Sequence, residues 1–252
     1  MYNNYIFDLY GTLADIRTNE EKPCLWRKMS EFYTSLGAFY TPLQLRQTFR
    51  RLERECICRM QRDAEESGQR DMLVEPDLTD VFWKLFLEKG VNCERQTAQL
   101  TANFFRTLSR QLLVVYDGVK DTLKELHHRG KHLYLLSNAQ SDFTRPELEI
   151  MGLTEFFDGI LISSEEGCKK PCPAFFRRLI ERYDLDPARC LMTGNEENSD
   201  IAGACYVGMD SLYLHTATSS IPQGKYKSTY CVTDGDWKKV AEILLEGNMR
   251  NS

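Results

Sequence analysis

The pattern of apolar residues divides the chain into two parts, and the first part is mainly helical. Residues 4–8 form a short apolar segment that predicts a strand, followed by a turn at Gly11. From about residue 20 to residue 110, apolar side chains recur every three or four positions, which is typical of amphipathic helices. The expected helices cover 20–36, a stretch from Pro42 to beyond Cys56, 77–89 and 94–110, with a loop at 67–76. Four consecutive helices indicate a helical bundle.

From about residue 113 the pattern changes to short apolar strands that alternate with helices. The expected strands are 132–136, 159–163, 189–193 and 210–214, and the expected helices are 119–129, 143–151, 173–183 and 199–207. Gly152 and Gly208 stand where two of these helices should end. Such alternation predicts a parallel sheet covered by helices on both faces.

The order of these elements predicts two domains, one inserted into the other. The strand at 4–8 belongs with the later strands, so the helical block interrupts an α/β domain. We therefore expect a core formed by 1–14 and 113–252, and a helical cap formed by 15–112.

Composition narrows the class of protein. The chain has 252 residues, with 32 basic and 37 acidic side chains, and its net charge of −5 argues against binding to nucleic acids or membrane surfaces. No signal peptide is evident, and the apolar run 112–116 is far too short to cross a bilayer. The nine cysteines form no C-x-x-C pair, which favours reduced thiols in the cytoplasm. We expect a monomer or homodimer that acts on a small molecule.

Polar residues follow four of the expected strands at their carboxyl ends. They are Asp8, the pair Ser137 and Asn138, Lys170, and the pair Asn195 and Asp200. Ligands of parallel α/β sheets bind at this edge, so these side chains are the candidates for chemistry.

Four short motifs in this set resemble those of the haloacid dehalogenase superfamily. The first is Asp8-Leu9-Tyr10-Gly11-Thr12, the second Ser137-Asn138, the third Lys170-Pro171, and the fourth Gly194-Asn195 with Asp200 five residues later. The resemblance covers the whole chain, because a helical insertion directly after the first motif matches the first cap type of that superfamily. It implies a Rossmann-like core with a four-helix-bundle cap.

The resemblance also implies a role for each matching residue. Asp8 would be the nucleophile that forms a covalent intermediate, and Lys170 would hold its charge. Thr12 and Ser137 would offer hydroxyls to the transferred group, with Asn138 beside them and the main chain at Gly11 donating to an oxyanion. The candidate metal-binding positions are Asp8, Tyr10, Asn195 and Asp200. Lys169 is the alternative to Lys170 as the lysine whose ammonium would hold the charge of Asp8.

Two positions depart from the phosphatases of the superfamily. The phosphatases carry a second aspartate two residues after the nucleophile, and this aspartate acts as general acid and base. This chain has Tyr10 at that position. They also carry a magnesium-binding aspartate where this chain has Asn195, a neutral ligand that should weaken Mg²⁺ binding.

These departures leave three functions open. The resemblance slightly favours hydrolysis of phosphate esters or anhydrides, with Mg²⁺ as cofactor and a preference for good leaving groups. The alternative is 2-haloacid dehalogenation, which uses a tyrosine at the Tyr10 position and no metal, and in which Arg27 would bind the substrate carboxylate. Against it, Phe176 stands where that branch has an aromatic hydroxyl, and the spacing from Asn195 to Asp200 is phosphatase-like. The third hypothesis is a degenerate protein that binds or regulates without turnover.

Overall fold

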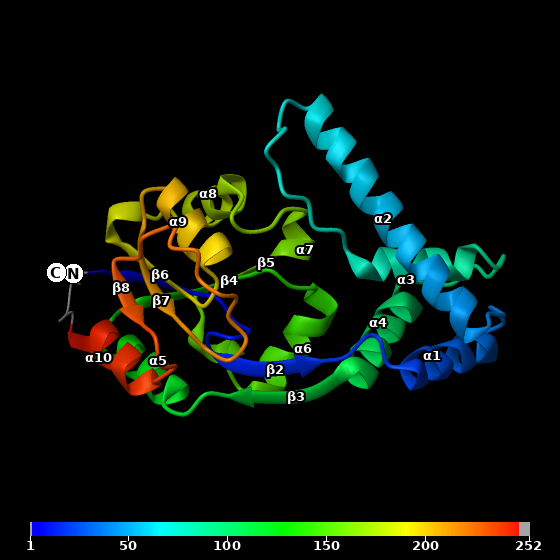
Figure 1. Cartoon of the computed structure of the whole chain (residues 1–252), viewed down its shortest axis with the longest axis horizontal. Helices are drawn as coiled ribbons and strands as arrows, with labels where there is room; N and C mark the ends of the chain where they lie inside the picture. The colour runs from blue at the N-terminus through cyan, green and yellow to red at the C-terminus, as the bar shows by residue number, and fades with distance from the viewer. Residues whose placement is uncertain (1, 247–252) are drawn as a thin grey trace.

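The computed structural model describes residues 2–246 and contains a large parallel sheet and a small antiparallel one (Figure 1). The large sheet has six strands in the order β5-β4-β1-β6-β7-β8. Their bounds are β1 (Asn4–Phe7), β4 (His132–Ser137), β5 (Gly159–Ile162), β6 (Cys190–Gly194), β7 (Asp210–Leu214) and β8 (Tyr230–Val232). The predicted α/β fold with a parallel sheet is therefore confirmed.

Helices cover both faces of this sheet. They are α5 (Val119–His128), α6 (Ser141–Met151), α7 (Ser163–Glu166), α8 (Pro173–Arg182), α9 (Ala202–Tyr206) and α10 (Trp237–Glu246). In β1, the side chains of Tyr5 and Phe7 belong to the apolar cluster under α5, α6 and α10, whereas Ile6 belongs to the cluster under α8 and α9. This alternation explains why a fully buried strand reads as a continuous apolar run.

The helical block lies beside the large sheet (Figure 1). Its buried side chains form an apolar cluster of their own, to which Phe143 of α6 also belongs. Its helices are α1 (Pro23–Ser35), α2 (Pro42–Glu66), α3 (Leu78–Leu87) and α4 (Arg95–Ser109), and we call them the cap helices. Thr41 caps α2 as a reciprocal capping box with Gln44, and Pro42 occupies the first helical turn. Aromatic rings fill the centre of the cluster, where Phe105 lies 5.3–5.7 Å, centroid to centroid, from three others, Trp26, Phe49 and Phe82.

An antiparallel ribbon joins the cap helices to the core. It pairs β2 (Ala14–Thr18) with β3 (Arg110–Val115), two strands that the sequence pattern did not predict. Both predicted domain boundaries, at 14/15 and 112/113, fall inside this ribbon. The strands were missed because they are short and only partly buried, so their apolar pattern is weak. The division into core and cap domains stays a proposal. The expected core also includes residues 247–252, which lie outside the residues that the structure describes.

The cap also contacts the core through the loop that precedes α3. The main chain of Leu73 accepts a hydrogen bond from Lys169 N at 2.9 Å, and Glu75 N donates to Gly167 O at 3.1 Å. These contacts place the loop against the segment that carries Lys170. Among residues 2–246, no helix is both long and apolar enough to cross a membrane.

Candidate active site

The sheet order brings three of the four motifs to one place. β1 lies between β4 and β6, so Asp8, Ser137 and Asn195 meet at the carboxyl edge of adjacent strands. Lys170 reaches the same edge from the segment between α7 and α8. The grouping predicted from strand ends is thus present in the fold.

Lys170 is the centre of this group. Its ammonium donates to Asp8 Oδ1 and to the main-chain oxygen of Leu136, both at 2.7 Å. Asp200 Oδ1 is also 2.7 Å away and forms an ion pair with the ammonium. The Lys170 side chain is only 1% exposed, and burial alone would lower its pKa, but the charges of Asp200 and Asp8 raise the pKa above the ordinary value. Lys170 therefore stays charged beside Asp8.

Asp200 is buried behind the lysine. Burial raises its pKa to about 6, with Lys170 acting in the opposite direction and Asp8 in the same one. Asp200 Oδ2 accepts a hydrogen bond from Glu196 N at 3.0 Å. Gly194 permits this approach, because a Cβ at that position would overlap the Asp200 carboxylate. The fourth motif thus needs glycine at its first position for a steric reason.

Gly11 and Asn195 meet on the other side of Asp8. Gly11 has φ of +83°, and a Cβ there would overlap the side chains of Asn195 and Thr218. Asn195 Nδ2 lies 3.4 Å from Thr218 Oγ1 and 3.3 Å from Ser219 Oγ. These contacts turn Asn195 Oδ1 toward the Thr12 hydroxyl, 3.3 Å away.

The second motif holds the third in place. Asn138 Oδ1 accepts from Lys170 N at 2.8 Å, and Asn138 Nδ2 donates to Lys170 O at 3.0 Å. This reciprocal pair fixes the main chain that carries the ammonium. The Ser137 hydroxyl is buried and has no hydrogen-bond partner within residues 2–246. A buried hydroxyl in that condition is available to a ligand.

Two oxygens near Asp8 could bind Mg²⁺. Within residues 2–246, Asp8 Oδ2 and Asn195 Oδ1 each accept a hydrogen bond from the Thr12 hydroxyl, at 3.4 and 3.3 Å, and have no other hydrogen-bond partner. Asp200 is already paired with Lys170, and the Tyr10 hydroxyl donates to Glu147. Within residues 2–246 there is no group of three His, Cys, Asp or Glu side chains able to hold a metal. The remaining carboxylate and amide oxygens suit a hard cation, but they carry only one charge.

The side chain of Tyr10 points to a buried carboxylate that sequence reasoning missed. Its hydroxyl donates to Glu147 and lies 3.1 Å from Thr144 Oγ1. Glu147, 1% exposed, also accepts from Arg106 and Arg110. Burial and the Glu147 charge raise the pKa of Tyr10 above its usual range. Tyr10 is therefore a neutral phenol with its proton directed away from Asp8.

Two adjoining cavities lie on either side of Tyr10. The first, about 360 Å³, is the nucleophile pocket, and its lining includes Asp8, Tyr10, Asn138, Lys170, Asn195 and Asp200. The second, about 270 Å³, lies toward the cap helices, and its lining includes Tyr10, Glu20, Glu75, Arg106, Asn138 and Phe143. We call the second cavity the chamber. Tyr10, Ile16 and Asn138 line both cavities, so the chamber adjoins the pocket that contains Asp8.

Two sequence candidates lie elsewhere. Arg27 is on the exposed side of α1, its Nε 4.0 Å from Glu31 Oε1, and it lines neither cavity. Arg106 is the arginine that the chamber contains instead. Lys169 pairs with Glu75 at 3.1 Å and is 41% exposed, so Lys170 is the lysine that reaches Asp8.

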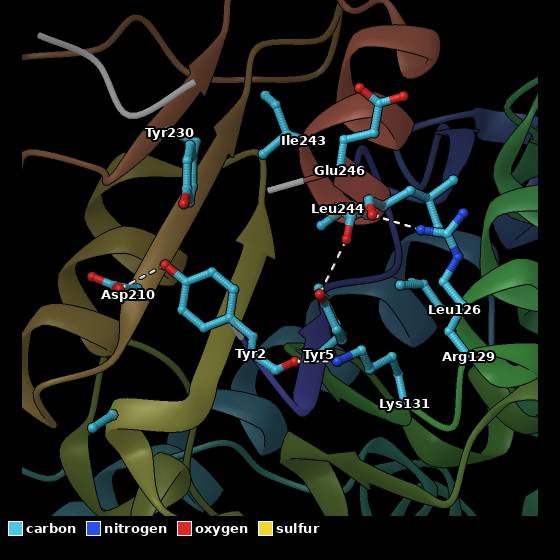
Figure 2. Close-up of a pocket in the computed structure, with 12 residues that line it drawn as sticks. Tyr2, Tyr5, Leu126, Arg129, Lys131, Asp210, Tyr230, Ile243, Leu244 and Glu246 are labelled. Atoms are coloured by element: carbon cyan, nitrogen blue, oxygen red, sulfur yellow. Dashed lines mark hydrogen bonds between the residues drawn. The ribbon is translucent and has the colours of Figure 1, made fainter. Parts of the chain in front are cut away.

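A larger cavity, about 480 Å³, lies away from these motifs, between the N-terminal segment and α10 (Figure 2). Several of its polar groups are already paired: the Tyr2 hydroxyl donates to Asp210 Oδ2 at 2.6 Å, and the Tyr5 hydroxyl donates to Leu244 O at 3.1 Å. Arg129 donates to Leu245 O at 2.6 Å. None of the four motifs reaches this cavity, so size alone does not identify the active site.

Known proteins resemble this chain in sequence over much of its length. The sequence model of the haloacid dehalogenase-like hydrolases matches residues 2–208. The chain is 34% identical over 119 residues to a phosphoglycolate phosphatase of Vibrio vulnificus (strain CMCP6), covering 47% of this chain and 52% of that protein. It is 30% identical over 128 residues to a phosphoserine phosphatase of Thermus thermophilus, covering 51% of each. The matches thus span about half the length of these relatives.

Solved structures resemble the chain over nearly its full length. A 2-haloacid dehalogenase from Pseudomonas syringae pv. Tomato DC3000 superimposes with a TM-score of 0.64 at 18% identity, covering 98% of this chain and 100% of that one. A HAD-hydrolase from Bacillus subtilis, bound to magnesium, gives a TM-score of 0.54 at 20% identity, covering 97% and 99%. At these identities the likeness establishes the fold.

Proposed function

Because the chain belongs to the haloacid dehalogenase-like hydrolases, whose sequence model matches residues 2–208, we propose that it hydrolyses phosphate esters or anhydrides of small metabolites through a covalent intermediate at Asp8. The observation that carries this proposal is the Lys170 ammonium between Asp8 and Asp200. It engages Oδ1 of Asp8 and leaves Oδ2 beside the nucleophile pocket. The curated phosphatase relatives support the same chemistry.

The reaction would proceed in two displacements at phosphorus. Asp8 Oδ2 attacks the phosphoryl group, the bond to the leaving oxygen breaks, and the phosphoryl group is carried on the carboxylate. Water then attacks the phosphorus, the bond between the phosphorus and Asp8 Oδ2 breaks, and inorganic phosphate leaves. The proton lost by the water goes to the released phosphate or to solvent, and the Asp8 carboxylate is regenerated. Lys170 stabilises the negative charge, and the hydroxyls of Thr12 and Ser137 donate to phosphoryl oxygens. Mg²⁺ held by Asp8 and Asn195 would supply further positive charge to those oxygens.

Tyr10 determines which leaving groups are suitable. Its phenol donates to Glu147, and burial raises its pKa, so it is a poor proton donor to the leaving oxygen. We therefore expect acyl and aryl phosphates, whose leaving groups need little protonation, to be hydrolysed faster than alkyl phosphates. The rate should fall steeply as the pKa of the leaving group rises.

Dehalogenation of 2-haloacids is the second candidate, and Tyr10 is the observation that favours it. A halide leaves without a proton, so a neutral tyrosine next to the nucleophile is no obstacle. In that reaction water would attack the carbonyl carbon of the Asp8 ester, whereas in phosphate hydrolysis water attacks phosphorus.

The test measures phosphate release from acyl, aryl and alkyl phosphates with and without Mg²⁺, for the wild type and Asp8→Asn. The proposal predicts release that needs Asp8 and favours good leaving groups. Halide release from 2-haloacids without any phosphate release would support the second candidate. If neither reaction occurred, both hydrolase proposals would be wrong. The result would then support the third hypothesis, a protein that binds or regulates without turnover.

A further inference from the structure

Glu147 is a buried charged residue that the proposed chemistry does not use. It lies on α6 and is 1% exposed. Arg106 donates from Nε to Glu147 Oε1 at 2.8 Å and from Nη2 to Oε2 at 3.1 Å. Arg110 donates from Nη1 to Oε1 at 2.9 Å, and the Tyr10 hydroxyl donates to Oε2. One carboxylate thus has four hydrogen bonds.

The partners of Glu147 come from separate parts of the chain. Tyr10 follows the nucleophile by two residues, Arg106 is in the last turn of α4, and Arg110 begins β3. The Arg106 guanidinium also lies over two aromatic rings, 5.5 Å from the centroid of Tyr10 and 5.3 Å from that of Phe143. The Glu147 carboxylate therefore links three segments: the loop after β1 that carries Asp8 and Tyr10, the last cap helix α4, and the ribbon of β2 and β3.

We propose that Glu147 is a positioning residue that fixes Tyr10, the wall shared by the nucleophile pocket and the chamber, and Arg106, which lines the chamber. Tyr10 lines both cavities and Arg106 lines the chamber. Within residues 2–246, the Tyr10 hydroxyl has Thr144 as its other hydrogen-bond partner, and the Arg106 guanidinium has its contacts with the rings of Tyr10 and Phe143. This inference rests on the proposed function, because the wall matters for a leaving group that extends from Asp8.

The charge of Glu147 is needed as well as its shape. Two guanidinium groups converge on it, and a neutral amide could not balance them or accept all four hydrogen bonds. In Glu147→Gln, one amide oxygen remains an acceptor, while the amide N–H groups face donors. Arg106 and Tyr10 should then lose their fixed orientation although the volume of the side chain is unchanged.

The test compares two substrates in the same variant. Acetyl phosphate has a small leaving group, whereas 4-nitrophenyl phosphate has one that reaches the chamber. In Glu147→Gln we expect kcat/KM for 4-nitrophenyl phosphate to fall by about tenfold more than that for acetyl phosphate. Simple loss of folded enzyme would lower both equally and leave their ratio unchanged. Glu149→Gln is the matched control, because Glu149 is exposed on the same helix.

A double-mutant cycle tests whether Glu147 acts through Tyr10. Tyr10→Phe removes the hydroxyl and keeps the ring, so Glu147→Gln should shift the substrate ratio less in that background than in the wild type. Equal shifts in both backgrounds would overturn the link to Tyr10. An unchanged ratio in the single variant would overturn the positioning role.

Hydrogen–deuterium exchange gives a readout that does not depend on turnover. Glu147→Gln should speed exchange at the end of α4 and in β3, and Glu149→Gln should not. If the wild type hydrolysed neither phosphate but exchange changed as expected, the proposed function would fail while the structural link held. Unchanged exchange would contradict the link whatever the activity.

Discussion

Lys170 Nζ lies 2.7 Å from Asp8 Oδ1, and the lysine side chain is almost completely buried. A buried ammonium beside a nucleophilic carboxylate has two effects. It compensates the negative charge that Asp8 keeps in the interior, and it is already in place when further charge develops during the reaction. Oδ2 of the same carboxylate lies beside the pocket, 3.4 Å from the Thr12 hydroxyl.

Removal of the Lys170 charge should affect stability and activity together. Lys170→Met leaves Asp8 and Asp200 without their cation, which should lower the free energy of unfolding by about 3–5 kcal/mol at pH 7. Urea denaturation measures this change. Lys170→Met/Asp200→Asn should recover part of the stability but none of the activity. Recovery of activity in the double variant would contradict the catalytic role of Lys170.

Asn195→Asp should strengthen Mg²⁺ binding. The substitution adds a second negative charge to the oxygens beside Asp8, and we expect the Mg²⁺ concentration for half-maximal activity to fall by about tenfold. Isothermal titration calorimetry provides a second readout with no substrate present. Asn195→Ala is the control and should weaken binding. Equal affinity in the wild type and Asn195→Asp would show that position 195 does not contact the metal.

The acid stability of the protein should depend on Glu147. Burial opposes its ionisation, but hydrogen bonds and charge from Arg106, together with Tyr10 and Arg110, lower its pKa below the ordinary 4.5. A lowered carboxyl pKa stabilises the fold above pH 4.5, and that contribution is lost as pH falls through the folded-state pKa. Glu147→Gln should therefore cost about 1–3 kcal/mol at pH 7 and less near pH 3. A cost that does not change with pH would contradict this ionic role.

The centre of the cap helices should be sensitive to truncation. Phe105 is fully buried among other aromatic rings, so Phe105→Ala should lower the free energy of unfolding by about 3–5 kcal/mol. Leu100→Ala on the same helix is the control, because Leu100 is 62% exposed and should change stability by less than about 0.5 kcal/mol. Thermal and urea unfolding would measure both. Similar losses at the two positions would contradict the packing described for α4.

The sequence predicted the grouping of the motif residues because each strand could be recognised from its own local apolar run. Asp8 and Asn138 directly follow such strands, and the carboxyl ends of parallel strands necessarily share an edge. Of the two candidate lysines, Lys170 contacts Asp8 and Lys169 pairs with Glu75. The catalytic roles of these residues stay predictions.

The remaining features depend on contacts between distant segments. Glu147 and Arg106 are 41 residues apart, and neither belongs to a recognisable motif. The only hint of this contact in the sequence was Arg106, a charged residue that directly follows Phe105 on a helix with an apolar face. Arg27 was a candidate only for the dehalogenase alternative, because of its place early in the cap, and the structure leaves it on the exposed side of its helix. Placement of a cap side chain requires the tertiary fold, which periodicity does not provide.

The most direct test of the account is detection of the covalent intermediate on Asp8. The enzyme is mixed with acetyl phosphate and Mg²⁺, quenched rapidly in acid, digested and analysed by mass spectrometry. The account predicts the added mass of one phosphoryl group on the peptide that contains Asp8, and none in Asp8→Asn. Phosphate release by the wild type with no modified peptide, or with undiminished release by Asp8→Asn, would contradict it.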